Sequence, residues 1–378
     1  MKPYEKNVIY ITLLSTLQSV ISTPVVAAED TDLQQEILNL KHKVERLEKS
    51  RQATEPPRMN PLSKMTFSGL VEVEAGYLDG PEGSESDLTV ATVELGIEVQ
   101  PTPWVNAHVM LLAEEDETEP PEIDEAIFTL ANSTVSPWSL AAGRMVVPFG
   151  NFDSGMISDP LTLEIGETRE TALQLGYVTQ GFHALAYLFN GDTQDGGHEA
   201  IDQFGIKLGY AHDGSDTLPG LDLGISWISN LTDSNSLQET IVNPINLQQT
   251  VPGWSANATL HWNRFTLISE YVTAAETFST TDLAFNGTGA KPSAWNLELD
   301  TDVKIGNHPA ALAVALQQTS EATALSLPET RWLVGLSVEI QDNTTLAMEI
   351  AHDTAYDEAK GGNGEATDTL TIQLAVAF

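Results

Sequence analysis

The last ten residues of the 378-residue chain read Thr369-Leu370-Thr371-Ile372-Gln373-Leu374-Ala375-Val376-Ala377-Phe378. Every second residue from Leu370 to Phe378 is apolar, and a period of two places these side chains on one face of a β-strand. The same alternation recurs upstream, for example over 92–99, 295–300 and 331–339. The pattern predicts a protein built from strands that have one apolar and one polar face.

Sixteen such segments follow residue 64, and each is close to the length of about 9–11 residues that crosses a bilayer as a tilted strand. We predict strands at 65–78, 88–100, 104–114, 123–131, 138–148, 170–178, 181–190, 201–212, 220–230, 253–262, 264–275, 292–303, 309–319, 328–339, 343–353 and 367–378.

The connections between these segments alternate between long and short. The long ones include 79–87, 115–122, 149–169, 191–200, 231–252, 276–291 and 354–366, and the short ones include 101–103, 179–180, 263, 304–308 and 341–343. Short turns on one side, long loops on the other and an even strand number are typical of bacterial outer-membrane barrels, whereas a soluble sandwich has no reason to segregate its loops. The sequence therefore predicts an all-β fold, a 16-stranded antiparallel transmembrane β-barrel over 65–378.

Aromatic residues gather beside the short connections. These are Trp104, Trp138, Trp262, Phe265 and Phe378. Aromatic rings prefer the membrane–water interface, so their shared location predicts a girdle on the periplasmic side of a barrel in the outer membrane.

The first 64 residues do not alternate. An apolar run over 8–17, Pro24 and the small residues Val26-Ala27-Ala28 predict a signal peptide over 1–28. A heptad seam over 29–50, formed by Leu33, Ile37, Leu40, Val44 and Leu47, predicts a short periplasmic coiled coil, with a single amphipathic helix as the alternative. The proline-containing stretch 51–64 is predicted to be a linker, and we expect a homotrimer because porin barrels commonly form trimers.

Composition excludes several classes of function. The chain holds 54 Asp and Glu against 17 Lys and Arg, a net charge of -37, which disfavours nucleic acid as a partner. It has no cysteine, and it contains neither HExxH, GxSxG nor a P-loop. We therefore expect no catalytic residue, no cofactor and no metal site, and hence no enzyme.

Alternation also predicts which charges face the lumen. The predicted wall residues are Glu72, Glu94, Glu98, Lys207, Glu270, Glu298, Asp300, Lys304, Arg331 and Glu339. A lumen with more carboxylates than bases favours cations over small anions. The alternative is that these acids only solvate the inner wall.

The connection over 148–170 is the longest that mixes apolar and charged residues. Apolar side chains such as Phe149, Phe152 and Ile165 are unfavourable in water, so we expect this segment to fold onto or into the barrel. The predicted constriction and substrate residues are Arg144, Asp153, Asp159, Glu164, Glu167, Arg169 and Glu170. A lid that contacts a neighbouring subunit is the alternative for the segment, and salt bridges within the wall are the alternative for Arg144 and Arg169.

A distinctive string of residues runs through the same region. It comprises Asp124-Glu125-Ala126, Ala142-Gly143-Arg144, Val147-Pro148-Phe149-Gly150-Asn151-Phe152, Met156-Ile157-Ser158-Asp159-Pro160-Leu161-Thr162-Leu163 and Glu167-Thr168-Arg169-Glu170-Thr171. This string resembles the LbtU-type siderophore porins of gram-negative outer membranes. The resemblance implies passage of a ferric siderophore without an energised plug domain, with outer-membrane lipid and lipopolysaccharide as surroundings. A general cation-preferring porin and a structural outer-membrane anchor with a periplasmic coiled coil are the alternative hypotheses.

Overall fold

The computed structural model describes residues 64–115, 121–194, 200–215 and 218–378. The predicted signal peptide, the coiled coil and all but the last residue of the predicted linker lie outside the described residues.

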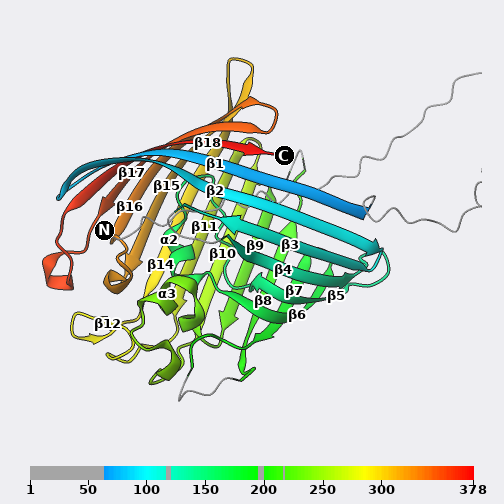
Figure 1. The fold of residues 1–378 in the computed structure, drawn as a ribbon, viewed down its shortest axis with the longest axis horizontal. Helices are drawn as coiled ribbons and strands as arrows, with labels where there is room; N and C mark the ends of the chain where they lie inside the picture. The colour runs from blue at the N-terminus through cyan, green and yellow to red at the C-terminus, as the bar shows by residue number, and fades with distance from the viewer. Residues whose placement is uncertain (1–63, 116–120, 195–199, 216–217) are drawn as a thin grey trace, which may run out of the picture. The chain divides into compact units, whose positions relative to one another are not determined.

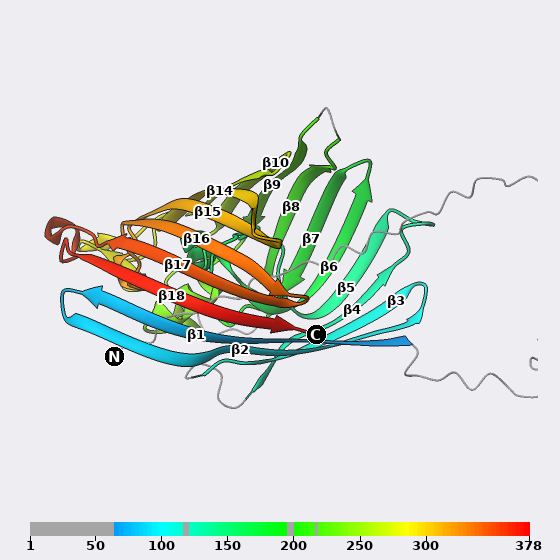
Figure 2. The same ribbon diagram turned by 90° about the horizontal axis from the view of Figure 1, so that it is seen from above.

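Sixteen of the described strands form one closed antiparallel barrel, in which each strand pairs with its sequence neighbours and β1 also pairs with β18 (Figures 1 and 2). The strands are β1 (Met65–Gly80), β2 (Gly83–Thr102), β3 (Val105–Ala113), β4 (Glu122–Ala131), β5 (Trp138–Val146), β6 (Arg169–Thr179), β7 (Phe182–Phe189), β8 (Gln203–His212), β9 (Gly220–Ile228), β10 (Gly253–Trp262), β11 (Phe265–Ala274), β14 (Ser293–Ile305), β15 (His308–Ser320), β16 (Thr330–Gln341), β17 (Thr344–Thr354) and β18 (Ala366–Ala377).

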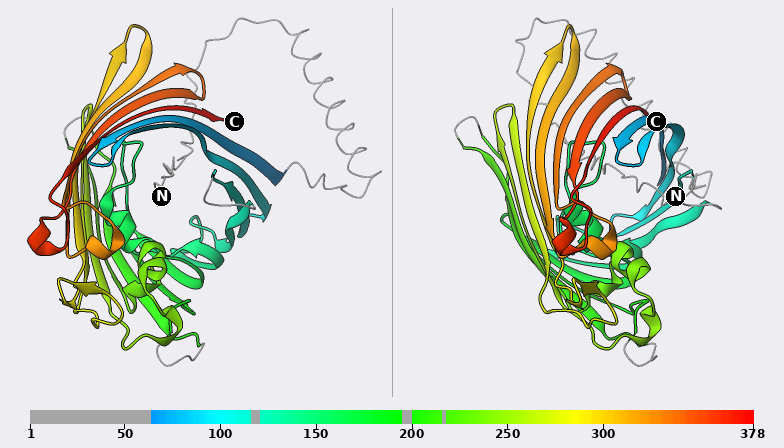
Figure 3. Two further views of the ribbon diagram at one scale, coloured as in Figure 1. Left: turned by 60° about the vertical axis from the view of Figure 1, so that its left-hand side comes forward. Right: turned by 90° about the vertical axis from the view of Figure 1, so that its left-hand side faces the viewer.

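Short elements occupy the long connections at one end of the barrel (Figures 1 and 3). They are α2 (Leu161–Gly166), η2 (Leu231–Asp233), α3 (Asn235–Thr240), η3 (Pro244–Asn246), η4 (Thr323–Leu325), η5 (Glu358–Lys360) and a separate two-stranded sheet of β12 (Ala284–Phe285) and β13 (Thr288–Gly289). No helix in the described part of the chain is both long and apolar enough to cross a bilayer.

The predicted fold, a 16-stranded antiparallel barrel, is confirmed, and most predicted strand ends lie within a few residues of the observed ones. The predicted loop over 79–87 is wrong, because β2 already begins at Gly83 and only Pro81 and Glu82 separate it from β1. The stretch 83–87 is polar throughout, so it carries no apolar alternation that could mark a strand. Its backbone nevertheless continues the hairpin.

The two faces of each strand differ in polarity. On β14, Leu297 and Leu299 are each 42% exposed and point outward, whereas Glu298 between them is fully buried on the inner side. On β10, Trp254 and Trp262 both point outward, eight residues apart. Eight residues span roughly 26 Å of strand. A tilt of about 40° reduces this to roughly 20 Å along the barrel axis, similar to the apolar band of about 25 Å in outer-membrane barrels.

The predicted aromatic girdle is present at the short-turn end. Trp104, Trp138, Trp262, Phe265 and Phe378 all have exposed side chains there. Trp138 pairs across the ladder with Tyr177, and their ring centroids lie 4.8 Å apart. These aromatic side chains form a girdle at one edge of the apolar outer band, where a membrane–water interface would lie.

Candidate functional site

The connection between β5 and β6, residues 147–168, lies against the inner face of the barrel; we call it the strap. The backbone N–H groups of Asn151 and Phe152 donate hydrogen bonds of 2.7 and 2.9 Å to the carboxylate of Glu270 on β11. Glu270 points inward, since its outward neighbour Tyr271 is exposed. The prediction that this segment folds onto or into the barrel is confirmed.

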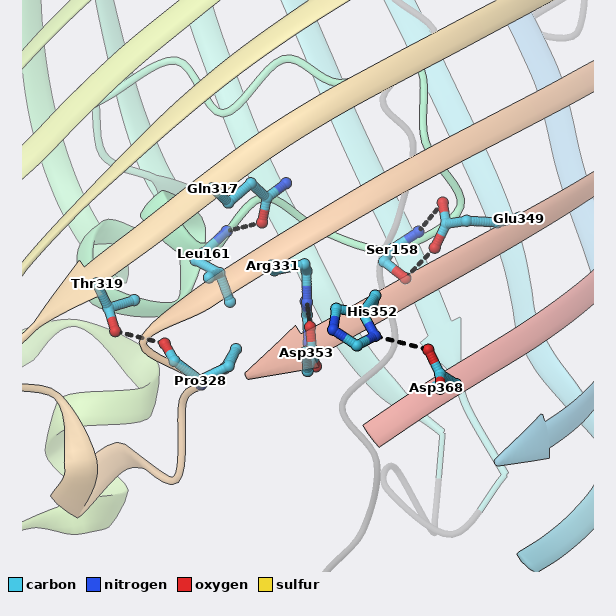
Figure 4. A network of polar contacts seen from close by, with 10 residues as sticks. All are labelled: Ser158, Leu161, Gln317, Thr319, Pro328, Arg331, Glu349, His352, Asp353 and Asp368. Carbon is cyan, nitrogen blue, oxygen red and sulfur yellow. Dashed lines mark hydrogen bonds and ion pairs between the residues drawn. The ribbon is translucent and has the colours of Figure 1, made fainter. Parts of the chain in front are cut away.

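Two further wall carboxylates hold the strap. Glu298 on β14 accepts hydrogen bonds from the N–H of Gly155 at 2.5 Å and from the hydroxyl of Ser154 at 2.8 Å. Glu349 on β17 accepts a bond of 2.6 Å from the N–H of Ile157. It also accepts bonds from Ser158, one of 3.1 Å from the N–H and one from the hydroxyl (Figure 4). The strap therefore crosses the wall from β11 to β17.

The strap then returns along the same wall. The N–H of Leu161, at the start of α2, donates to the side-chain oxygen of Gln317 on β15 at 3.0 Å (Figure 4). The hydroxyl of Thr162 donates to Glu270 at 3.1 Å, so one carboxylate binds both arms of the strap. The strap is thus folded double against the half of the barrel that contains β11 to β17.

An apolar socket on the otherwise polar inner face receives Met156. The socket is formed by Ala313, Ala315, Leu333 and Ala351, and Met156 is 1% exposed within it. A Cβ atom at Gly335 would lie 2.9 Å from the Met156 sulfur, so the glycine provides room for this side chain. Sequence reasoning missed the socket, and its only signal was the run of small residues at inward positions of β15 to β17.

The strap turns sharply around Phe152. Phe152 has a φ of 55° and Gly150 a φ of 74°, both in the left-handed region. A Cβ at Gly150 or Gly166 would lie 2.2 or 2.8 Å from the Phe152 ring, so these glycines make space for it. A non-glycine residue in this region costs about 1–3 kcal/mol. The hydrogen bond from Phe152 to Glu270 opposes that cost.

The long loops cover the second arm of the strap, residues 161–167, on the side away from the wall. On α3, the N–H of Asn235 donates to the Glu167 carbonyl at 2.9 Å, and Ser236 donates its hydroxyl hydrogen to Glu164 at 3.0 Å. An apolar core joins the strap to these loops; its members include Leu161, Ile165, Leu237, Ile241, Leu247, Val251, Phe278 and Leu283. Burial raises the pKa of Glu167, and the neighbouring Arg169 guanidinium opposes this shift.

The basic residues predicted at the wall and the strap contact protein groups. Arg331 donates two hydrogen bonds of 2.8 Å to Asp353 (Figure 4). Arg169 lies 3.0 Å from Asp124 and 3.4 Å from Glu167. These pairs correspond to the salt-bridge alternative for Arg169.

Two other bases also have neighbours within the protein. Lys207 donates to the carbonyl of Gly150 at 2.6 Å, so it too holds the strap. Arg144 interacts electrostatically with Asp124 and Glu170. The parts of the distinctive string on β4, β5 and β6 therefore meet near Arg169, whereas its stretch 156–163 lies against β15 to β17.

The acids predicted to form a constriction also have partners. Asp153 accepts a 2.5 Å hydrogen bond from the Asn151 amide, and burial raises the pKa of Asp153. Glu170 accepts a bond of 3.2 Å from the N–H of Asp192. Asp159 likewise has a partner within the protein. The role of these acids in a constriction stays a prediction.

The wall away from the strap is acidic. Within their described ranges, β18 and β1 to β3 contain no Lys or Arg. The inward positions of β1 and β2 carry Glu72 and Glu94, together with Glu98, which accepts a hydrogen bond from Asn106. His108 on β3 lies 3.6 Å from Glu125.

Three further predicted wall residues, all at inward positions of the strand alternation, lie in different surroundings. Lys304 and Glu339 are exposed close to the short turns, near the ends of β14 and β16. Asp300 lies beside the strap, where its carboxyl carbon is 3.3 Å from the position of a Cβ at Gly155. Among the residues that the structure describes, no group of three or more His, Asp or Glu side chains is placed to hold a metal ion.

Comparison with curated proteins gives relatives in two genera. A UPF0422 protein of Coxiella burnetii is 30% identical over 306 residues, which cover 78% of this chain and 65% of the relative. The UPF0422 protein lpl2888 of Legionella pneumophila is 28% identical over 359 residues, covering 83% of this chain and 66% of the relative. The relatives of this chain are UPF0422 proteins. The chain spans about two thirds of their length, and no family model matches it.

Solved structures identify the fold. An anion-selective porin from Comamonas acidovorans matches with a TM-score of 0.58 at 14% identity, over 83% of this chain and 99% of the porin. The outer-membrane channel DcaP of Acinetobacter baumannii gives 0.59 at 12% identity, over 83% and 97%. OprB of Pseudomonas putida gives 0.60 at 9% identity, over 85% and 96%. The barrel therefore has the fold of outer-membrane porins.

Proposed function

We propose that the protein is an outer-membrane channel through which small hydrophilic solutes diffuse passively. The observation that carries this proposal is the barrel itself, apolar outside and polar inside, with a strap folded against part of its inner wall. Barrels of 16–18 strands leave an aqueous lumen rather than a filled core. The porin fold of the solved structures supports the same function.

The charge distribution supports a preference for cations. Residues 64–378 contain 46 of the 54 acids but only nine of the 17 bases. Arg169 and Arg331 are engaged in ion pairs, and Lys207 binds the strap. A carboxylate-rich lumen attracts cations and repels small anions.

A ferric siderophore is the solute implied by the resemblance to LbtU-type porins. The acidic wall would repel an anionic ferric chelate, so a neutral or cationic chelate is the form compatible with this lumen. Growth of a deletion strain on defined ferric siderophores tests this hypothesis. Growth equal to that of the parent strain on every iron source would remove it and leave a general cation-preferring porin.

Residues 29–50 support a separate proposal, that the chain forms a homotrimer with a periplasmic coiled coil. The heptad seam supports the coiled coil, and the trimers that porin barrels commonly form support the oligomeric state. Deletion of 29–55 tests it: loss of the trimer in detergent would support the coil, whereas an unchanged oligomer would contradict it.

Osmotic swelling of proteoliposomes tests the channel proposal. Liposomes that contain the purified protein should swell in an isotonic pentose, because the sugar enters through the lumen and water follows. Liposomes with the heat-unfolded protein are the control. Absence of swelling by folded protein in several small sugars would contradict the proposal.

A further inference from the structure

We propose that Glu270, Glu298 and Glu349 are positioning residues that hold the strap back against the wall and so keep the lumen open. This inference rests on the channel function proposed above. It assigns a role to carboxylates that, by sequence alone, belong to the polar face of the wall.

The three carboxylates share one mode of binding. Each accepts at least one backbone N–H bond and at least one hydroxyl bond from the strap. All three side chains are buried, and a buried polar group that loses its hydrogen-bond partner destabilises the fold. A carboxylate that only solvates a pore wall does not need to meet the backbone of a segment more than 100 positions away in sequence.

The path of the strap explains why three anchors are required. From β11 to β17 the ladder makes four steps, through β14, β15 and β16. Four steps span roughly 19 Å. The seven-residue interval from Asn151 to Ser158 can reach at most about 25 Å when fully extended. The arm is therefore long enough to follow the wall with some slack, and the three anchors along its length hold it there.

Displacement of the strap has one available direction. The wall lies behind the strap, and the Met156 socket fixes its depth there. An arm released from its anchors therefore moves toward the lumen. The role of the three carboxylates is therefore to keep the lumen wide, and not to set its charge.

Single-channel recording of a triple variant, E270Q/E298Q/E349Q, tests this role. Both oxygens of each carboxyl group accept bonds from the strap, and glutamine keeps the shape of the side chain but replaces one of these oxygens by an NH2 group, which cannot accept them. We expect a mean conductance reduced roughly twofold, with frequent current fluctuations as the strap enters the lumen. The control E72Q/E74Q/E98Q removes three acids from β1 and β2, on the wall away from the strap. It should conduct without added fluctuations.

A disulfide that ties the strap to β14 distinguishes loss of strap position from misfolding of the barrel. The chain has no cysteine, and a Cβ at Gly155 would lie 3.3 Å from the Asp300 carboxyl carbon, so side chains at these two positions are in contact and can be tested as a disulfide pair. In the triple variant, the added pair G155C/D300C should restore steady conductance when oxidised and lose it when reduced.

The outcomes separate the two proposals. Wild-type protein that does not conduct would overturn the channel function. Wild-type conduction together with a folded triple variant of unchanged conductance and unchanged noise would overturn only the role of the three carboxylates. A steady increase in conductance would also contradict it, because the strap would then have left the lumen rather than entered it.

Discussion

Gly143 shows how strictly one position can be determined by the backbone around it. Its φ is 138°, and a Cβ there would lie 1.9 Å from the carbonyl oxygen of Ala126 on the paired strand. Ala142-Gly143-Arg144 belongs to the distinctive string, but the sequence does not indicate why position 143 has to be glycine. The reason lies in the approach of β4, which no local pattern reveals.

Substitution of Gly143 by alanine should therefore destabilise the barrel. We expect Gly143→Ala to lower the free energy of unfolding by at least about 2 kcal/mol, through the strained φ and the clash with Ala126. Urea titration in lipid vesicles, followed by tryptophan fluorescence, measures this. The control is Gly76→Ala on β1, where nothing lies within 4 Å of the added atom. Equal stability of the two variants would contradict this explanation.

Asp233 in η2 makes the stability of the connection between β9 and β10 depend on pH. It is 1% exposed, and burial raises the pKa of its carboxyl to about 6, although hydrogen bonds from Thr193 and Asn230 oppose the shift. The unfolded value is about 3.9. Its contribution to stability is therefore complete below about pH 4 and is lost as the pH rises through 6.

Hydrogen exchange tests this behaviour. After correction for intrinsic rates, the amides of 190–194 and 229–235 should be better protected at pH 5 than at pH 7.5. Asp233→Asn keeps a side-chain acceptor but cannot ionise, so its protection should differ less between the two pH values. An equal pH dependence in the variant would assign the effect to another group.

The sequence did not predict which strap residues the inner-wall carboxylates bind. Alternation predicts that Glu270 and Glu298 face inward, and they do. It cannot predict that they bind Asn151 and Gly155, because those contacts depend on the path of a segment 119 and 143 positions away. The residue type was predictable, and the partner was not.

At the scale of elements, strands were predictable because one face meets an apolar environment and the other a polar one. This constraint imposes a period of two wherever the barrel has its apolar band. It does not act on 83–87 of β2, which is polar throughout. The helices α2 and α3 have six residues each, too few to show a helical period.

Arginine substitutions at neighbouring positions of β18 test the assignment of faces. Leu374 is exposed on the outer face, and Gln373 is buried on the inner face, where its amide donates to Glu74 at 3.0 Å. Leu374→Arg should cost about 2–4 kcal/mol, the cost of a base near the bilayer midplane. Gln373→Arg should cost much less, since the new charge lies beside a carboxylate.

Unfolding titrations of both variants in vesicles measure the difference. A greater loss for Gln373→Arg than for Leu374→Arg would reverse the assignment of the two faces and would contradict a lipid-facing outer surface.

At the scale of the whole molecule, charge and architecture have to be considered together. The barrel region carries the entire acidic excess, and β18 and β1 to β3 have acids and no base in their described ranges. The strap, its anchors and the apolar core that joins it to the long loops lie on one side of the lumen. The proposed path for solutes runs along the acidic side. The net charge of -37 is therefore a property of the permeation pathway as much as of the surface.

Recording from the purified protein in a planar lipid bilayer, with a tenfold KCl gradient across it, tests whether the barrel is a cation-preferring channel. We expect discrete conductance steps and a reversal potential whose sign shows that potassium permeates more readily than chloride. A bilayer that stays silent after insertion of folded protein would contradict the channel, and a reversal potential of the opposite sign would contradict the acidic pathway.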